Sequence, residues 1–181
     1  QKMFKAYDNW PTIAENAYNN KHEKIDFVDI DHIVLAGMGG SGAIGDFFAS
    51  ILSKANIHVS VIKGYLLPNT IDKNTLIITT SVSGNTIETL TILKNAMKTD
   101  AKIIAFSDGG QMKKICDQNQ IMHKNLKSYH SPRGSFTSFL YSMLKILSPI
   151  LPIQKNDVIE SINELKKLKM NISSNNLNED N

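Results

Sequence analysis

The stretch TLIITTSVSGNTIETLTIL, residues 75–93, decides the fold. A short apolar run, Leu76 to Ile78, leads into a turn of six small or polar residues, Ser81-Val82-Ser83-Gly84-Asn85-Thr86. A helical pattern then begins, with Ile87, Leu90 and Leu93 at three-residue spacing. The order of these patterns predicts a strand, a hydroxyl-rich turn and a helix.

The turn between this strand and this helix has the chemistry of an anion site. The first backbone N–H groups of a helix have no intrahelical acceptor, and the helix dipole is positive at that end. Ser81, Ser83 and Thr86 add hydroxyls, while Gly84 and Asn85 complete the turn. A phosphate monoester, with several acceptor oxygens and about two negative charges, suits such a turn. The alternative is that Ser83 or Asn85 is only a helix N-cap and the other hydroxyls are ordinary turn residues.

Outward from this stretch, short apolar runs alternate with helical patterns. We expect the other strands at 32–36, 57–62, 102–106 and 121–123, and helices over 44–52, 87–93, 135–147 and 157–169. This alternation predicts an α/β fold with a mostly parallel, doubly wound sheet. The predicted division is an N-terminal helical extension (1–30), the α/β domain (31–153), a C-terminal helix (154–169) and a polar linker or tail (170–181).

A second glycine-rich loop, Gly37-Met38-Gly39-Gly40-Ser41-Gly42, follows the first strand. It contains a G-x-G-x-x-G pattern, but the second strand ends at Val61-Ile62-Lys63 without the acidic residue that a dinucleotide site needs. Two other interpretations are a tight strand-to-helix turn and a close approach to a sugar phosphate, with the N–H groups of Gly40 and Ser41 as donors. Since ligands of open parallel sheets bind at the carboxyl ends of the strands, we expect this loop and the turn at Ser81 to converge.

Arg133 follows Pro132 just before the helical pattern at 135–147. A guanidinium group there could stabilise a developing oxyanion through charge-assisted hydrogen bonds. The alternative is a solvated surface arginine.

The bulk composition excludes several classes of function. A net charge of +3 with scattered basic residues does not indicate a nucleic-acid partner, and no apolar stretch reaches the roughly 18 residues that span a membrane. The single cysteine, Cys116, excludes an internal disulfide, and we expect it in the core of a cytoplasmic protein. The five histidines show no metal-ligand spacing, so no metal is predicted. A chain that starts at Gln1 is compatible with a piece of a longer protein.

The loops at 37–42 and 81–86, together with Pro132-Arg133, resemble the sugar isomerase (SIS) domain. More narrowly, they resemble the first SIS domain of the bifunctional phosphoglucose/phosphomannose isomerases. The resemblance implies a five-stranded sheet of flavodoxin-like order, a homodimer, hexose 6-phosphates as ligands and no cofactor. It implies that Ser81, Ser83 and Thr86 hold the substrate phosphate, with Gly84 and Asn85 in the same binding turn. Gly40 and Ser41 would contact the sugar, and Arg133 would stabilise the cis-enediolate of aldose–ketose interconversion.

The resemblance also implies that part of the catalytic machinery lies elsewhere. The general base, a glutamate, and the ring-opening histidine are expected from a second SIS domain, and neither can be matched to Glu160, Glu164 or His130. We therefore expect that the chain is a fragment ending in a linker, which binds hexose 6-phosphates weakly and isomerises them poorly. The alternative is a non-catalytic, phosphosugar-binding regulatory domain.

Overall fold

The computed structural model describes residues 3–23 and 25–173. They divide into two compact units, a sheet unit of residues 26–127 and a helical unit formed by residues 1–25 together with the segment from 128 onward. The sheet unit carries both glycine-containing loops identified in the sequence, whereas the helical unit carries Arg133.

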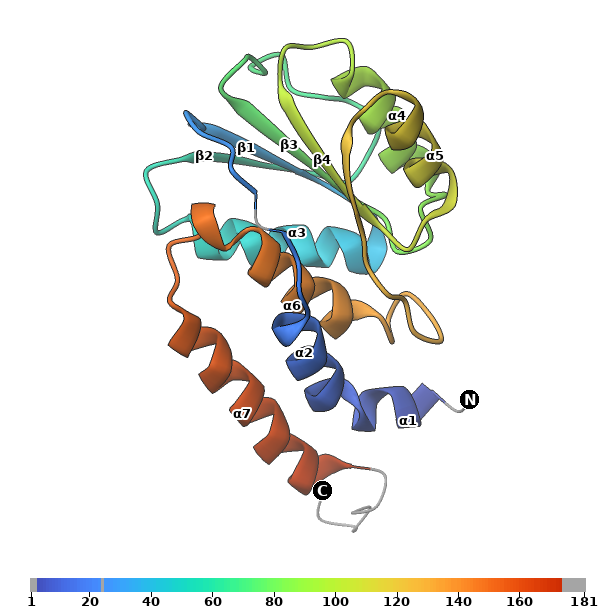
Figure 1. Ribbon diagram of the computed structural model, residues 1–181, viewed down its shortest axis with the longest axis vertical. Helices are drawn as coiled ribbons and strands as arrows, with labels where there is room; N and C mark the ends of the chain where they lie inside the picture. Colours follow the sequence, from blue (N-terminus) through green and yellow to red (C-terminus); the bar gives the residue numbers. More distant parts are fainter. Residues whose placement is uncertain (1–2, 24, 174–181) are drawn as a thin grey trace. The chain divides into compact units, whose positions relative to one another are not determined.

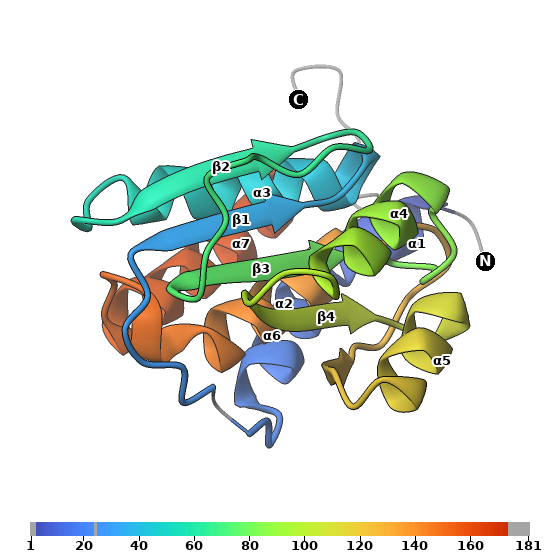
Figure 2. The same cartoon turned by 90° about the horizontal axis from the view of Figure 1, so that it is seen from above.

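The sheet unit is built on five parallel strands in the order β2-β1-β3-β4-β5. The first four lie side by side in this order in Figure 2. Their bounds are β1 His32–Ala36, β2 His58–Ile62, β3 Thr75–Thr80, β4 Lys102–Ser107 and β5 Met122–Asn125. The order is that of flavodoxin-like sheets, so the predicted fold class is confirmed.

The helices of the sheet unit cover both faces of the sheet. They are α3 Gly39–Leu52, α4 Ile87–Ala96 and α5 Gly110–Gln118. Figure 1 shows α3 on one face, and α4 and α5 on the other. This follows from right-handed crossovers, because the chain moves from β1 to β2 in one direction and from β3 through β5 in the opposite one. The direction changes between β1 and β3, where ligands of such sheets bind.

The two central strands form the core of this unit. Every residue of β1 and β3 is buried, whereas β2, at the edge, is only partly covered. Val34, Ile77 and Ala96 pack together on one side of the core. Cys116 is fully buried against Leu93, Ala105 and Met112, as predicted, and burial raises the pKa of its thiol to about 11.

The helical unit contains α1 Met3–Asp8, α2 Trp10–Asn19, α6 Phe136–Ile146, the 3₁₀ turn Ser148–Ile150 and α7 Lys155–Ile172. Pro11 lies in the first turn of α2, where a missing N–H costs little. The indole of Trp10 donates a hydrogen bond to the carbonyl of Gly134 (3.3 Å), just before α6. Lys166 of α7 pairs with Glu15 of α2 at 2.8 Å.

The element boundaries differ from the expected ones most at α3, which begins at Gly39 rather than near residue 44, and at both ends of α7. Helix α7 begins with a capping box between Gln154 and Asp157, and it continues to Ile172. Residues 170–172, predicted to start the polar tail, therefore form the last turn of this helix. The rest of the predicted tail, 174–181, lies outside the described residues. Within the described part of the chain, none of the helices is long and apolar enough to cross a membrane.

Candidate functional site

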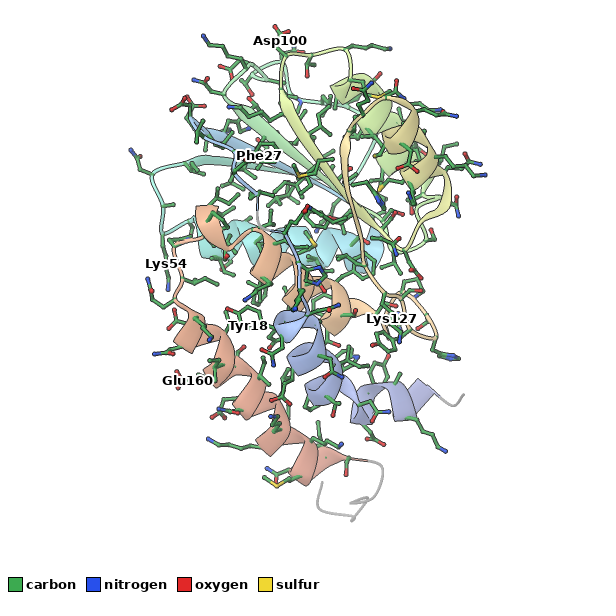
Figure 3. The ribbon with its side chains drawn as sticks, viewed as in Figure 1. Tyr18, Phe27, Lys54, Asp100, Lys127 and Glu160 are labelled. Carbon is green, nitrogen blue, oxygen red and sulfur yellow. The ribbon has the colours of Figure 1, made fainter. Side chains whose placement is uncertain are left out.

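The loops of interest all leave the carboxyl edge of the sheet. They are 37–38 after β1, 81–86 after β3 and 108–109 after β4, and each leads into the N-terminus of a helix. In Figure 3, Asp100, which precedes β4, marks the amino edge, and Lys127, which follows β5, lies on the carboxyl side. Three helix N-termini therefore gather at one edge, and each favours negative charge nearby.

The loop after β1 lies directly against the end of β3. A Cβ placed on Gly37 would stand 3.0 Å from the backbone of Ser41 and 3.0 Å from the carbonyl oxygen of Thr80. Strand pairing agrees, since Ala36 is opposite Thr79. The convergence of the two loops at one edge, expected from the sequence, is therefore observed.

Ser81 shapes the turn after β3 from inside. It is 1% exposed, and its hydroxyl lies 2.9 Å from the hydroxyl of Thr86 and accepts a hydrogen bond from the amide of Gly84 at 3.1 Å. These bonds hold Gly84 at φ +67°, a conformation that favours glycine. The contacts of Ser81 thus organise the loop, and its direct phosphate contact remains a prediction.

The N-terminus of α4 is open toward an anion. Thr86 is the N-cap residue, but no side chain caps the helix. No described residue accepts a hydrogen bond from the backbone amides of Thr86, Ile87, Glu88 or Thr89. Ser83 is exposed beside them. Four donors and a hydroxyl at one helix end match the oxygens of a phosphate group.

Asn85 has a role that the sequence did not reveal. Its side-chain oxygen accepts a hydrogen bond from the amide of Gln111 (3.0 Å), in the first turn of α5, and its side-chain nitrogen donates to the carbonyl of Ser83 (3.1 Å). The alternative that Ser83 or Asn85 is the N-cap of α4 is therefore wrong. Asn85 instead ties two neighbouring loops together, and the predicted substrate contact of this residue remains a prediction.

The glycine-rich loop requires one correction. The amide of Ser41, expected to be free for a sugar, donates to the carbonyl of Met38 at 3.0 Å in the tight first turn of α3. In the described structure, the amides of Gly39 and Gly40 have no acceptor. The available donors are thus Gly39 and Gly40, and Gly39 stands at φ +54°.

Lys63 and Tyr65, in the loop after β2, add side chains beside the same edge. The methylenes of Lys63 would stand 3.2 Å from a Cβ on Gly42, and its ammonium pairs with Asp46. Tyr65 hydrogen-bonds Glu88, and desolvation followed by the charge of this carboxylate raises the pKa of the phenol. Glu88 lies in the first turn of α4, where the dipole favours it.

The loop after β4 supports the turn after β3. The amide of Asp108 donates to the carbonyl of Val82 (3.1 Å), and the amide of Met112 donates to the carbonyl of Gly84 (2.8 Å). A Cβ on Gly84 would overlap the carbonyl of Gly109. These backbone contacts add to the side-chain bond of Asn85 in fixing the two loops against each other.

Arg133 and His130 belong to the helical unit. Arg133 is exposed, and its carbonyl accepts a hydrogen bond from Phe136 at the start of α6. His130, at φ +30°, lines a cavity of about 240 Å³ together with Asn9 and Asn16. The catalytic role of Arg133 remains a prediction.

A model of the SIS domain family matches residues 26–146 of the chain. A bifunctional phosphoglucose/phosphomannose isomerase of Caldicellulosiruptor bescii is 33% identical over 175 residues, which cover 92% of this chain and 51% of the relative. The protein of the same name from Aquifex aeolicus is 30% identical, covering 90% of this chain and 50% of the relative. A D-glucosamine-6-phosphate 4-epimerase of Sulfolobus acidocaldarius is 27% identical, covering 77% of this chain and 42% of the relative.

Solved structures show the same fold at low identity. The C-terminal domain of glucosamine-fructose-6-phosphate aminotransferase from Francisella tularensis superposes with a TM-score of 0.61 at 17% identity, covering 93% of this chain and 53% of that one. The Vibrio vulnificus NanR protein complexed with ManNAc-6P superposes with a TM-score of 0.50 at 16% identity, covering 92% and 58%. The chain spans about half the length of the curated relatives it matches.

Proposed function

The chain belongs to the SIS domain family, and we propose that it is the first half of a sugar-phosphate isomerase. The reaction is the interconversion of glucose 6-phosphate or mannose 6-phosphate with fructose 6-phosphate through a cis-enediolate. The relatives named phosphoglucose/phosphomannose isomerase support this assignment. In the proposal this half binds the substrate, and the general base and the ring-opening group come from the other half.

The observation that carries the proposal is the uncapped N-terminus of α4. The amides of residues 86–89 have no acceptor among the described residues, and the exposed Ser83 stands beside them. We assign this end of α4 to the 6-phosphate, with the amides of Gly39 and Gly40 toward the sugar. Since the glycine loop abuts the same edge at Gly37, a single phosphorylated hexose can contact both loops.

The proposed reaction needs two kinds of group, those that bind the substrate and a base that transfers a proton. The two aldose substrates differ only at C2, the carbon that loses its proton, so a base that can reach either face converts both to the same ketose. Removing this proton leaves negative charge on the enediolate oxygens, and we assign its stabilisation to Arg133. A positioned base contributes roughly 10²- to 10⁴-fold in rate, so this chain by itself is expected to turn over slowly.

A second candidate function is a non-catalytic phosphosugar sensor. The solved NanR complex contains a phosphorylated sugar, and its superposition supports the same fold in that setting. A sensor and an isomerase both need the phosphate site. Only an isomerase also needs a site that is complementary to the enediolate.

Calorimetric titration of the 181-residue chain separates the possibilities. The ligands are fructose 6-phosphate, the enediolate mimic 5-phosphoarabinonate, and NADPH. The isomerase proposal predicts binding of both sugar phosphates, with the mimic tighter because catalytic sites favour the transition state. Equal affinities favour the sensor. Binding of NADPH without sugar phosphates would overturn both.

We also propose that the protein works as a cytoplasmic homodimer. A single, buried cysteine fits a reducing compartment. Light scattering during size-exclusion chromatography tests the dimer, and a monomeric mass at assay concentration contradicts it.

A further inference from the structure

The hydroxyl of Ser107 at the end of β4 is the centre of a small, partly buried hydrogen-bond cluster. Ser107 has no exposed surface. Its oxygen lies 2.8 Å from the carbonyl of Gly109, 3.2 Å from the amide of Gly109 and 2.8 Å from Nε2 of His123 on β5. One serine hydroxyl can donate one hydrogen bond and accept two, so these three partners use its full capacity.

The assignment of donors follows from this count. The Gly109 carbonyl can only accept, so it takes the single hydroxyl proton of Ser107. The Gly109 amide donates to the same oxygen. Nε2 of His123 must therefore donate as well, which places a proton on this nitrogen.

This cluster fixes Gly109 in an unusual backbone conformation. Gly109 has φ +108° and ψ −124°, and it is the N-cap residue of α5. Its carbonyl is packed so closely on Gly84 that a Cβ there would overlap it. Gly84 is the centre of the loop assigned above to the phosphate. By fixing Gly109, Ser107 therefore fixes the backbone group that packs against this loop.

We propose that Ser107 and His123 are positioning residues for the phosphate-binding loop, acting through Gly109 on Gly84. The inference rests on the proposed function. Neither residue touches the ligand in this account. His123 orients the Ser107 hydroxyl, Ser107 fixes Gly109, and the carbonyl of Gly109 sets the position of the turn 81–86. The bond between Asn85 and Gln111 closes the same two loops on the exposed side.

Three substitutions in the 181-residue chain test the proposal. Ser107→Ala removes the hydroxyl, His123→Leu removes the donor, and His123→Gln keeps an N–H donor on a side chain of similar length. Controls come from a second serine–histidine cluster, where the hydroxyl of Ser60 on β2 lies 3.0 Å from Nε2 of His32 on β1 and 3.4 Å from Nε2 of His58. Ser60→Ala and His58→Leu delete the same groups without touching either loop.

Two measurements give the outcome: the affinity for fructose 6-phosphate, and amide hydrogen exchange of residues 83–86 without ligand. We expect Ser107→Ala and His123→Leu to weaken binding about tenfold, the effect of losing one or two hydrogen bonds. Amide exchange should accelerate at residues 83–86 in both variants. His123→Gln should have nearly the affinity and the exchange rates of the wild type. The Ser60 and His58 variants should match the wild type.

The possible failures can be told apart. If the wild type binds fructose 6-phosphate and His123→Leu binds equally well with unchanged exchange, the positioning role is overturned and the proposed function stands. If the wild type does not bind any phosphosugar, both the proposed function and this inference are overturned. Should His123→Leu fail to fold, Ser107→Ala decides the question, because a buried serine-to-alanine change leaves almost the same volume.

Discussion

The carbonyl oxygen of Thr80 lies 3.0 Å from the position that a Cβ on Gly37 would occupy. This contact joins the loop after β1 to the end of β3 at the point where the strand order reverses. The proposed sugar site depends on it, because only a residue without a side chain lets the two loops approach so closely.

We therefore expect Gly37→Ala to lower both stability and phosphosugar affinity. The added methyl group meets backbone atoms on two sides, and such overpacking typically costs about 1–3 kcal/mol. Gly64→Ala is the matched control, since a Cβ there meets nothing within 4 Å. Urea unfolding and calorimetry compare the two variants, and equal midpoints and affinities would contradict the proposed tight contact.

Asn85 offers a separation of stability from binding. Asn85→Ala leaves the amide of Gln111 without its acceptor, and loss of a capping acceptor costs about 1 kcal/mol. Asn85→Asp keeps the acceptor but adds a negative charge beside the phosphate site. The aspartate variant should retain more stability than alanine and yet bind fructose 6-phosphate more weakly than the wild type. Undiminished affinity of the aspartate variant would show that the phosphate binds elsewhere.

The two serines of the turn after β3 should behave differently. Ser83 is exposed, and its hydroxyl accepts one local bond, from the amide of Asn85, whereas Ser81 is 1% exposed and its hydroxyl bonds both Thr86 and Gly84. Ser83→Ala is expected to weaken binding several-fold, the effect of one hydrogen bond, with only a small change of the urea midpoint because its bond from the Asn85 amide is exposed to water. Ser81→Ala is expected to lower the midpoint. A reversed pattern would exchange the roles given to the two residues.

Arg133 is exposed, so its replacement should leave stability unchanged. In the isomerase proposal, Arg133→Ala weakens the binding of 5-phosphoarabinonate by about tenfold, because a charge-assisted hydrogen bond is lost. The affinity for inorganic phosphate should not change. Arg133→Lys keeps the charge without the planar fork and should be intermediate. An equal loss of affinity for both ligands would place the guanidinium at the phosphate rather than at the enediolate.

Two histidines make stability depend on pH. Burial and then the nearby His58 lower the pKa of His32 below 6.5, and burial and then Lys113 lower that of His123. The unfolded chain therefore binds more protons than the folded one just below pH 6.5, so stability should fall as the pH drops through this range. Urea unfolding at about pH 7.5 and about pH 5 measures it.

The double variant His32→Asn, His123→Gln lacks both groups and provides the control for this pH effect. Its stability should change less between the two pH values. A wild type that is more stable at the lower pH would contradict the burial of these rings.

The sequence predicted the sheet well because its signal is local. Short apolar runs flanked by glycine and serine marked the strands, and the parallel order placed the loops after β1 and β3 at one edge. The same reasoning missed the contacts of Asn85 with Gln111, 26 positions away, and of Ser107 with His123, 16 positions away. Such contacts depend on how neighbouring loops pack. The one available signal was that a serine ends β4 and another directly follows β3, each with a glycine soon after it.

An NMR titration of the 181-residue chain with fructose 6-phosphate, following the backbone amides, tests most directly whether both loops bind one ligand. A single phosphosugar site at this edge predicts that the amides of Gly39 and Gly40 shift together with those of residues 83 and 86–89, all with one dissociation constant. Shifts confined to one loop, different constants for the two loops, or changes only elsewhere in the chain would contradict a single phosphosugar site at this edge of the sheet.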